Sequence, residues 1–167
     1  TGEQGIAPDP VWDPMEFLVN ACHERNMEFH AWLNPYRVST SGNTVFAPGH
    51  IYNKHPEWFV TYNKMILFDP GLPQSRAFIC MVVADIVSRY DVDAIHMDDY
   101  FYPYPVAGLP FPDDASFDAY GRSKGYKDNQ RADWRRENVN LLVQDIKQTI
   151  LRTKPWVRFG ISPFGIY

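Results

Sequence analysis

Apolar residues recur at helical spacing in three stretches of the chain, and each stretch is followed by a short extended segment. Apolar positions three and four residues apart are typical of a helix with one buried face. The helices are expected at about 14–26, 73–90 and 132–152, and the strands at about 27–34, 93–98 and 157–162. This alternation of helix and strand predicts a parallel sheet with right-handed crossovers.

Alternate side chains of a strand point to opposite faces of the sheet. One face of each predicted strand is apolar, with Phe29, Ala31, Leu33, Ile95, Met97, Phe159 and Ile161. The other face becomes polar towards the carboxyl end, with His30, Trp32, Asn34, His96, Asp98, Gly160 and Ser162. An open sheet covered by helices on both faces has continuous apolar strands instead. One polar face therefore favours a barrel interior that opens into a site.

The fold class expected is α/β, in the form of a partial TIM (β/α)8 barrel. A complete barrel needs roughly 250 residues, whereas the chain has 167. Residues 1–167 are therefore interpreted as the central part of a single catalytic barrel domain. Catalytic residues of such barrels lie at the carboxyl ends of the strands and in the loops that follow.

Two long segments without strong periodicity follow predicted strands. Residues 35–72 contain one short apolar run, at 65–68, and residues 99–115 are rich in Tyr, Phe and Pro. Loops of this length inside a compact domain are usually functional. Both segments are therefore expected to contribute to a site at the strand ends.

Asp98 and Asp99 end the second predicted strand. Glycoside hydrolysis typically uses two carboxyl groups on either side of the scissile bond. Neighbouring side chains on an extended chain diverge, so these two residues are not expected to form that pair. Both are predicted to be catalytic, with a further carboxylate from another strand. Alternatively, Asp99 orients the following loop through backbone hydrogen bonds.

His30 and His96 are expected just below the strand ends, inside the barrel mouth. They either contact substrate or act as interior histidines that position Asp98 or Asn34. A metal site needs three or four converging ligands. The two histidines with Asp98 and Asp99 would form an incomplete set, and no HxxxH or HxH spacing supports it. No metal and no other cofactor is predicted.

Aromatic residues make up 16% of the chain, and many lie near the predicted strand ends. Flat rings stack on the apolar faces of sugars, while Asn, Asp and Arg bind hydroxyls, although any single ring can equally serve packing. Arg37 can pair with Asp98 or Asp99, or bind an acidic sugar substituent. The predicted substrate contacts are His30, Trp32, Asn34, Tyr36, Arg37, His96, Tyr100, Tyr102, Ser162 and Phe164.

Composition narrows the classes of partner. A net charge of −4 argues against nucleic acid, which requires a basic surface. No apolar run approaches the ~20 residues of a membrane span. Cys22 and Cys80 lie in apolar helical stretches, where small buried side chains are expected, so they do not indicate a redox compartment. The predicted partner is a carbohydrate substrate.

Five ordered motifs resemble the glycosyl hydrolase-like family ten of bacterial proteins. They are FHAWLNPYR at 29–37, HPEW at 55–58, DAIHMDDYFYP at 93–103, DWRR at 133–136 and GISPFG at 160–165. The resemblance implies a (β/α)8 barrel to which this chain supplies roughly the third to fifth strands, the remaining strands coming from the parent protein. It also implies a secreted, periplasmic or lipid-anchored location in the cell envelope. The family includes hydrolases of peptidoglycan glycan strands that lack stem peptides.

The function expected is hydrolysis of a polysaccharide or peptidoglycan-type glycan by carboxylate acid–base catalysis. One alternative is a non-catalytic glycan-binding barrel that keeps the aromatic cleft. Another is a metal-dependent hydrolase such as a deacetylase, for which a chelator would change activity or melting temperature. The intact Asp98-Asp99 pair favours an enzyme over a pure binder.

Overall fold

The computed structural model describes residues 3–164. Its backbone contacts divide the described chain into two compact units. Unit 1 comprises residues 3–7, 36–76 and 101–140, and unit 2 comprises residues 8–35, 77–100 and 141–164. Gly165, the last residue of the GISPFG motif, lies outside the described residues.

Unit 2 is built on a three-stranded parallel sheet in the order β2-β7-β8. Its strands are β2 (His30–Trp32), β7 (Ala94–Met97) and β8 (Arg158–Ile161), and its helices are α1 (Pro14–His23) with the larger parts of α3 (Pro73–Arg89) and α5 (Arg131–Thr153). The element order and the parallel sheet confirm the predicted α/β class. The strands are shorter than predicted, although Leu33 N–H still donates to the His96 carbonyl beyond the end of β2.

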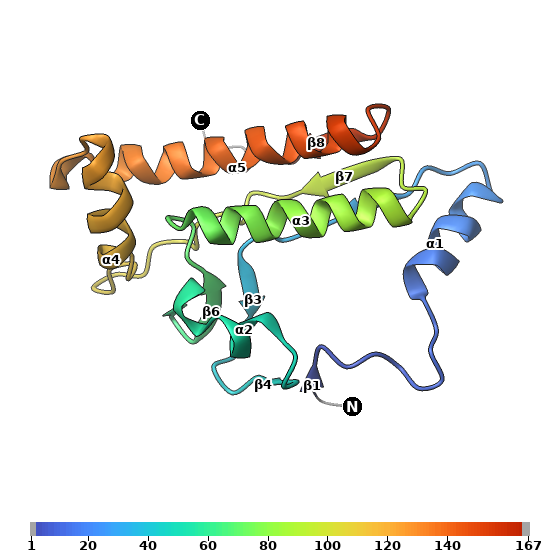
Figure 1. Ribbon diagram of the computed structural model, residues 1–167, viewed down its shortest axis with the longest axis horizontal. Coiled ribbons are helices and arrows are strands. Elements are labelled where there is room, and N and C mark those ends of the chain that lie inside the picture. Colours follow the sequence, from blue (N-terminus) through green and yellow to red (C-terminus); the bar gives the residue numbers. More distant parts are fainter. Residues whose placement is uncertain (1–2, 165–167) are drawn as a thin grey trace. The chain divides into compact units, whose positions relative to one another are not determined.

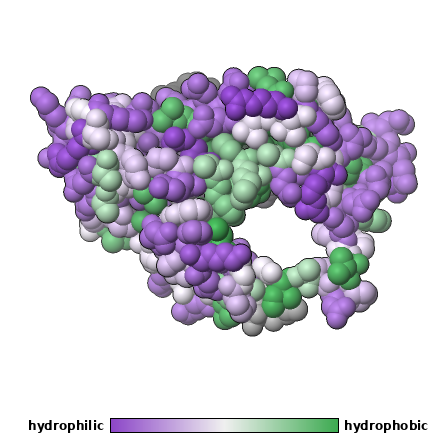
Figure 2. Space-filling view, viewed as in Figure 1, coloured by the Kyte–Doolittle hydropathy of each residue, from purple (hydrophilic) through white to green (hydrophobic). Residues whose placement is uncertain are grey.

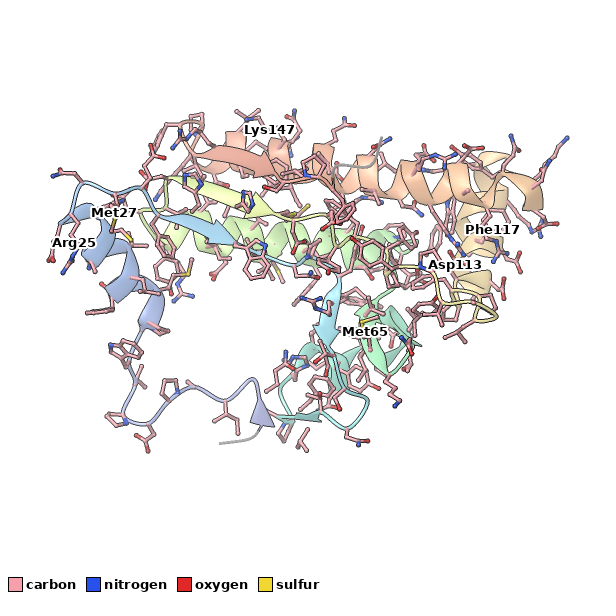
Figure 3. All side chains as sticks on the ribbon, turned by 180° about the vertical axis from the view of Figure 1, so that it is seen from behind. Arg25, Met27, Met65, Asp113, Phe117 and Lys147 are labelled. Atoms are coloured by element: carbon pink, nitrogen blue, oxygen red, sulfur yellow. The ribbon has the colours of Figure 1, made fainter. Side chains whose placement is uncertain are left out.

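The two faces of this sheet differ as the alternation predicts. Ala31, Ile95 and Met97 are buried on one face. Figure 1 looks onto α3 with the strands behind it, and Figure 3 shows the strands in front of the helix from the opposite side. Helices therefore cover the apolar face, and the polar face is the one seen in Figure 3.

Each long helix buries one stripe of residues spaced four apart. The stripe on α3 is Ile79, Val83 and Val87, and that on α5 is Leu142, Ile146 and Ile150. Burying such a side chain stabilises the fold by about 1.5–3 kcal/mol. The outward side of α3 is also partly apolar: Met81 is exposed, and Figure 2 shows hydrophobic side chains over the middle of this helix.

Polar contacts hold α1 against the amino ends of the strands. Asp13 is the N-cap of α1 and accepts the backbone N–H groups of Met15 and Glu16. At the other end, the Asp93 carboxylate lies 3.0 Å from His23 Nε2 and accepts the Phe29 N–H at 2.7 Å. These two hydrogen bonds, that from His23 foremost, lower the pKa of Asp93.

Unit 1 contains an antiparallel sheet, although residues 35–72 were expected to form a long loop. Its order is β3-β6-β5, from β3 (Arg37–Ser39), β5 (Phe59–Tyr62) and β6 (Met65–Phe68), beside the short parallel pair β1 (Glu3–Gln4) and β4 (Val45–Phe46). Asn63 and Lys64 connect β5 to β6 with positive φ angles of 46° and 66°. Two-residue hairpins require such backbone angles, and Asn adopts them readily. Asn63 between two apolar runs was therefore the signal for this hairpin.

Unit 1 also contains short helices, some before β5 and the others before α5. They are α2 (Ile51–Lys54), η1 (Pro56–Trp58), α4 (Asp114–Ser116), η2 (Phe117–Gly121), η3 (Arg122–Lys124) and η4 (Asp128–Gln130). Trp134 and Phe117 are fully buried, and their rings meet edge to face at 5.1 Å. A Cβ at Gly71 would lie only 2.5 Å from the Trp134 ring, so the packing requires glycine there.

None of the helices within residues 3–164 combines the length and the apolar character that crossing a membrane requires.

Candidate functional site

The polar face of the unit 2 sheet gathers four of the predicted site residues. Trp32 of β2 is in register with His96 of β7, which is in register with Gly160 of β8. Ser162 N–H donates to the Met97 carbonyl at 2.9 Å, which continues the ladder and brings Ser162 beside Asp98. Trp32 is 61% exposed. Trp32, His96, Asp98 and Ser162 therefore lie together at the carboxyl ends of parallel strands.

The side chain of Asp98 begins the loop that follows β7. Its Oδ1 accepts the backbone N–H of Tyr100 at 3.0 Å, which forms a turn of the type that Asp commonly makes. Asp98 therefore orients the following loop, a role that was expected as the alternative for Asp99. Asp99 is half-buried, and its catalytic role stays a prediction.

His96 is anchored by the third strand of the sheet. Its Nε2 lies 3.2 Å from the Ser162 hydroxyl oxygen, within hydrogen-bonding distance. The imidazole is half-buried, between the exposed Trp32 and the bare backbone of Gly160 in the same row. The structure therefore fixes the orientation of His96 beside Asp98.

His30 lies further from the strand ends than expected, and its predicted contact with substrate stays a prediction. His30 is in register with Ala94, one row closer to the amino ends of the strands. Its Nε2 lies 3.0 Å from Glu28 Oε2, and Glu28 also pairs with Arg158. Hydrogen bonds from His30 and Arg158 lower the pKa of Glu28. Sequence patterning had offered no signal for this network, because charged residues at strand starts are usually solvated.

Three predicted substrate contacts belong to unit 1. The Tyr36 side chain is fully buried, Arg37 is half-buried on β3, and Tyr102 is partly buried. The Tyr102 hydroxyl accepts a hydrogen bond from Asn138 Nδ2 at 3.3 Å, and burial raises the pKa of Tyr102. Burial counts against direct sugar contact by Tyr36, whose role stays a prediction.

The remaining predicted contacts belong to unit 2. Tyr100 and Phe164 are 41% and 65% exposed, and Asn34 is half-buried. The two exposed rings follow β7 and β8 directly. They are therefore available to a ligand at the carboxyl ends of these strands.

Unit 1 contains a buried charge network around Asp113 that the sequence pattern did not indicate. Asp113 is fully buried, and Arg135 grips it with two hydrogen bonds, from Nε to Oδ2 at 2.6 Å and from Nη2 to Oδ1 at 2.7 Å. Arg131 Nη1 adds a third contact at 3.1 Å. Arg135 belongs to the DWRR motif. This motif contributed to the family resemblance but did not indicate which residue pairs with Arg135. Figure 3 labels Asp113 in the loop before α4.

A second buried carboxyl group, Asp69, follows β6 in the same unit. It accepts the Gly71 N–H at 2.8 Å. Burial is the main cause that raises the pKa of Asp69, and the nearby Asp113 adds to it. The carboxyl group therefore favours its neutral form more than an exposed Asp does.

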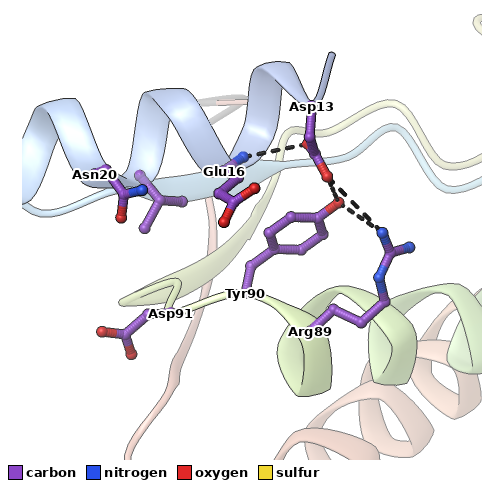
Figure 4. A pocket seen from close by; sticks show the side chains of 7 residues that line it. Asp13, Glu16, Asn20, Arg89, Tyr90 and Asp91 are labelled. Atoms are coloured by element: carbon purple, nitrogen blue, oxygen red, sulfur yellow. Dashed lines mark hydrogen bonds and ion pairs between the residues drawn. The ribbon is translucent and has the colours of Figure 1, made fainter. Parts of the chain in front are cut away.

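A separate pocket of about 410 Å³ in unit 2 is lined by α1 and by the end of α3 (Figure 4). The Tyr90 hydroxyl donates to Asp13 at 2.6 Å, and Arg89 Nη2 donates to the Tyr90 hydroxyl oxygen at 3.0 Å. The hydrogen bond from Tyr90 is the main cause that lowers the pKa of Asp13. These hydrogen bonds connect the N-cap of α1 to the end of α3.

Within the described range 3–164, no group of three or more His, Cys, Asp or Glu side chains is arranged to hold a metal ion.

Comparison with protein families gives a match over almost the whole chain. The model of a family described as Glycosyl hydrolase-like 10 matches residues 2–167. The chain is 46% identical over 169 residues to Glycosyl hydrolase YngK of Bacillus subtilis, covering 100% of this chain and 32% of that protein. It is 37% identical over 172 residues to Glycosyl hydrolase DigH of Escherichia coli, covering 97% of this chain and 38% of that protein. The chain thus spans about a third of the length of these relatives.

Solved structures share the fold at low sequence identity. An α-galactosidase from Lactobacillus brevis matches 90% of this chain and 18% of its own, with a TM-score of 0.57 and 16% identity. α-L-Fucosidase isoenzyme 2 from Paenibacillus thiaminolyticus matches 87% of this chain and 22% of its own, with a TM-score of 0.55 and 13% identity. The mixed α/β fold is therefore one that glycoside hydrolases use.

Proposed function

The chain belongs to the Glycosyl hydrolase-like 10 family, and we propose that its protein is a glycoside hydrolase with Asp98 in the active site. This proposal rests on the row of the exposed Trp32 and the half-buried His96, with Asp98 and Ser162 one row nearer the carboxyl ends of the strands. These residues lie at the carboxyl ends of parallel strands whose opposite face is apolar. Barrel enzymes use this end of the sheet for catalysis.

Asp98 serves as one of the two carboxyl groups of the reaction. In such a reaction one carboxyl group protonates the glycosidic oxygen, while the other activates a water molecule or attacks the anomeric carbon. Neighbouring Asp99 does not supply the second group, because adjacent side chains diverge. The second group belongs to another strand of the whole protein. Trp32 provides a flat surface for a sugar ring, and His96 provides a polar contact.

The finer features of the proposal concern the whole protein. We propose that this chain is the central part of a (β/α)8 barrel, and that the substrate is a peptidoglycan-type glycan or another polysaccharide of the cell envelope. A secreted, periplasmic or lipid-anchored location suits such a substrate. Family membership and the one-third span of the matched relatives support the partial-barrel part of this proposal. Fractionation of cells that express the tagged parent protein tests the location.

The experiment is incubation of the full-length parent protein with candidate glycans. The substrates are peptidoglycan glycan strands without stem peptides, and plant and host polysaccharides. The products are identified by mass analysis. Each cleavage adds one water molecule to the summed mass of the products. Shorter oligosaccharides from the wild-type protein and none from Asp98→Asn support the proposal. Intact glycans with the folded wild-type protein would reject it.

The hydrogen bond from Tyr100 N–H to Asp98 favours a second candidate function. A carboxylate engaged in a turn also suits a glycan-binding domain without turnover. Calorimetric titration with the same glycans separates the two functions. Binding with no product after prolonged incubation would identify a binding domain.

A further inference from the structure

The row Trp32–His96–Gly160 crosses the three parallel strands, and the side chains on the two sides of His96 differ greatly in size. An exposed indole lies on one side of the imidazole, and a residue without a side chain lies on the other. Glycine in a strand weakens it and often marks a place where another group approaches closely. Gly160 does not have the positive φ angle that would by itself require glycine. The space beside His96 is therefore the feature to explain.

The two ring nitrogens of His96 have different surroundings. Nε2 is held by the Ser162 hydroxyl at 3.2 Å. Nδ1 lies 3.5 Å from the position that a Cβ at residue 160 would occupy. Within residues 3–164, Ser162 is the hydrogen-bond partner found for this ring. Nδ1 therefore faces the space that Gly160 leaves open.

A sugar hydroxyl matches this nitrogen in either tautomer of the neutral imidazole. When Nε2 accepts from Ser162, Nδ1 carries the proton and donates to the sugar oxygen. When Nε2 donates to Ser162, Nδ1 accepts from the sugar hydroxyl. A carboxylate suits only the first arrangement. A hydroxyl therefore finds a hydrogen-bond partner at Nδ1 in both tautomers, and a carboxylate in only one.

We propose that His96 binds a sugar hydroxyl through Nδ1, that Ser162 is its positioning residue, and that Gly160 determines specificity by keeping that nitrogen accessible. This inference rests on the proposed glycoside hydrolase function. Trp32, the next residue in the row, stacks on the same sugar ring. In this proposal His96 binds one hydroxyl and Trp32 contacts one ring face of the same sugar unit.

Gly160→Ala in the full-length parent protein tests the role of the open space. The added methyl group would lie at ordinary contact distance from Nδ1, so the fold accommodates it. It would nevertheless cover the nitrogen. Loss of one hydrogen bond corresponds to a rise in KM of roughly 3- to 10-fold, with kcat within twofold and Tm nearly unchanged. Gly49→Ala is the matched control, because a Cβ there meets nothing within 4 Å.

Ser162→Ala tests the positioning role, and Ser162→Thr tests rescue by a retained hydroxyl. The alanine variant is expected to raise KM to a similar degree, and the threonine variant to restore it. The ¹⁵N shift of His96 Nε2 should change in Ser162→Ala and remain close to wild type in Ser162→Thr. A merely structural role would lower Tm without this spectroscopic change.

The outcomes separate the two levels of the proposal. A parent protein that neither binds nor cleaves a glycan overturns the proposed function together with this inference. A parent protein that cleaves glycans, while Gly160→Ala and Ser162→Ala keep the wild-type KM, overturns this inference alone. An unchanged ¹⁵N shift in Ser162→Ala rejects the positioning role of Ser162.

Discussion

The carboxylate of Asp98 accepts the backbone N–H of Tyr100 at 3.0 Å, so the proposed catalytic residue also starts the loop after β7. A substitution that removes both the charge and the hydrogen-bond acceptor would affect catalysis and loop geometry together, so the two effects could not be separated. Asparagine keeps an Oδ1 acceptor and removes only the ionisable group. The choice of variant therefore decides what a mutational experiment at this position measures.

We expect Asp98→Asn in the full-length parent protein to lower kcat by at least ~10²-fold, the scale of lost general acid–base catalysis. Its Tm should stay close to wild type, because the Tyr100 N–H keeps an acceptor. Steady-state kinetics and a melting curve check both quantities. Asp98→Ala should lower kcat to the same degree. It should also lower Tm, because the Tyr100 N–H loses its acceptor. Unchanged turnover in Asp98→Asn would remove this residue from the mechanism, and an equal loss in Asp99→Asn would make the two carboxyl groups one functional unit.

Trp32→Ala should weaken oligosaccharide binding by roughly 10- to 150-fold, because loss of a large apolar contact costs about 1.5–3 kcal/mol. The side chain is 61% exposed on the polar face of the sheet. Calorimetric titration of the parent protein measures the affinity. Trp156→Ala is the matched control, since Trp156 is 70% exposed outside the three strands. Unaltered affinity with a lower Tm would assign Trp32 to packing within the whole protein.

Asp113→Asn should destabilise the protein by about 3–5 kcal/mol, the usual cost of removing one partner from a buried ion pair. Arg135 and Arg131 would then face a neutral group at a fully buried position. Urea unfolding of the parent protein measures the free energy. Asp118→Asn, which breaks an exposed pair with Arg122, should have a much smaller effect, because water and salt screen exposed ion pairs. Equal effects of the two substitutions would contradict the importance of burial.

Asp69→Asn should raise Tm at neutral pH, with a gain that disappears as the pH falls towards 4. Burial raises the folded-state pKa of Asp69 above its ordinary value of 3.8, so folding favours the protonated form. This contribution to stability is present below the ordinary value and is lost as the pH rises through the higher folded-state pKa. Asparagine keeps an acceptor for the Gly71 N–H. Melting curves of both proteins from pH 4 to 8 provide the measurement, and a gain that grows at low pH would contradict the sign.

Residues 1–167 made alone are expected to be inactive and to self-associate or stay partly unfolded. The outer strands β2 and β8 present backbone edges, and Trp32 and Met81 are exposed. Open edges and apolar patches promote association. Light scattering with a melting curve checks this expectation. A monodisperse, cooperatively melting monomer with glycosidase activity would contradict the partial-barrel proposal.

Side-chain alternation by itself determined which face of each parallel strand is polar. The period of two is a local property of extended backbone, so Trp32, His96 and Ser162 were assigned to one face correctly. Helical spacing likewise predicted α3 and α5 to within a few residues. The five motifs were sufficient to indicate the family.

Only the tertiary structure decided which residues meet across the sheet. Alternation does not determine how far one strand slides along the next, and this register puts Trp32, not His30, beside His96. Asp113 and Arg135 are 22 residues apart in the chain, and no local pattern connects them. Register and buried charge pairs depend on contacts between distant segments, because the free energy of those contacts exists only once the segments have packed.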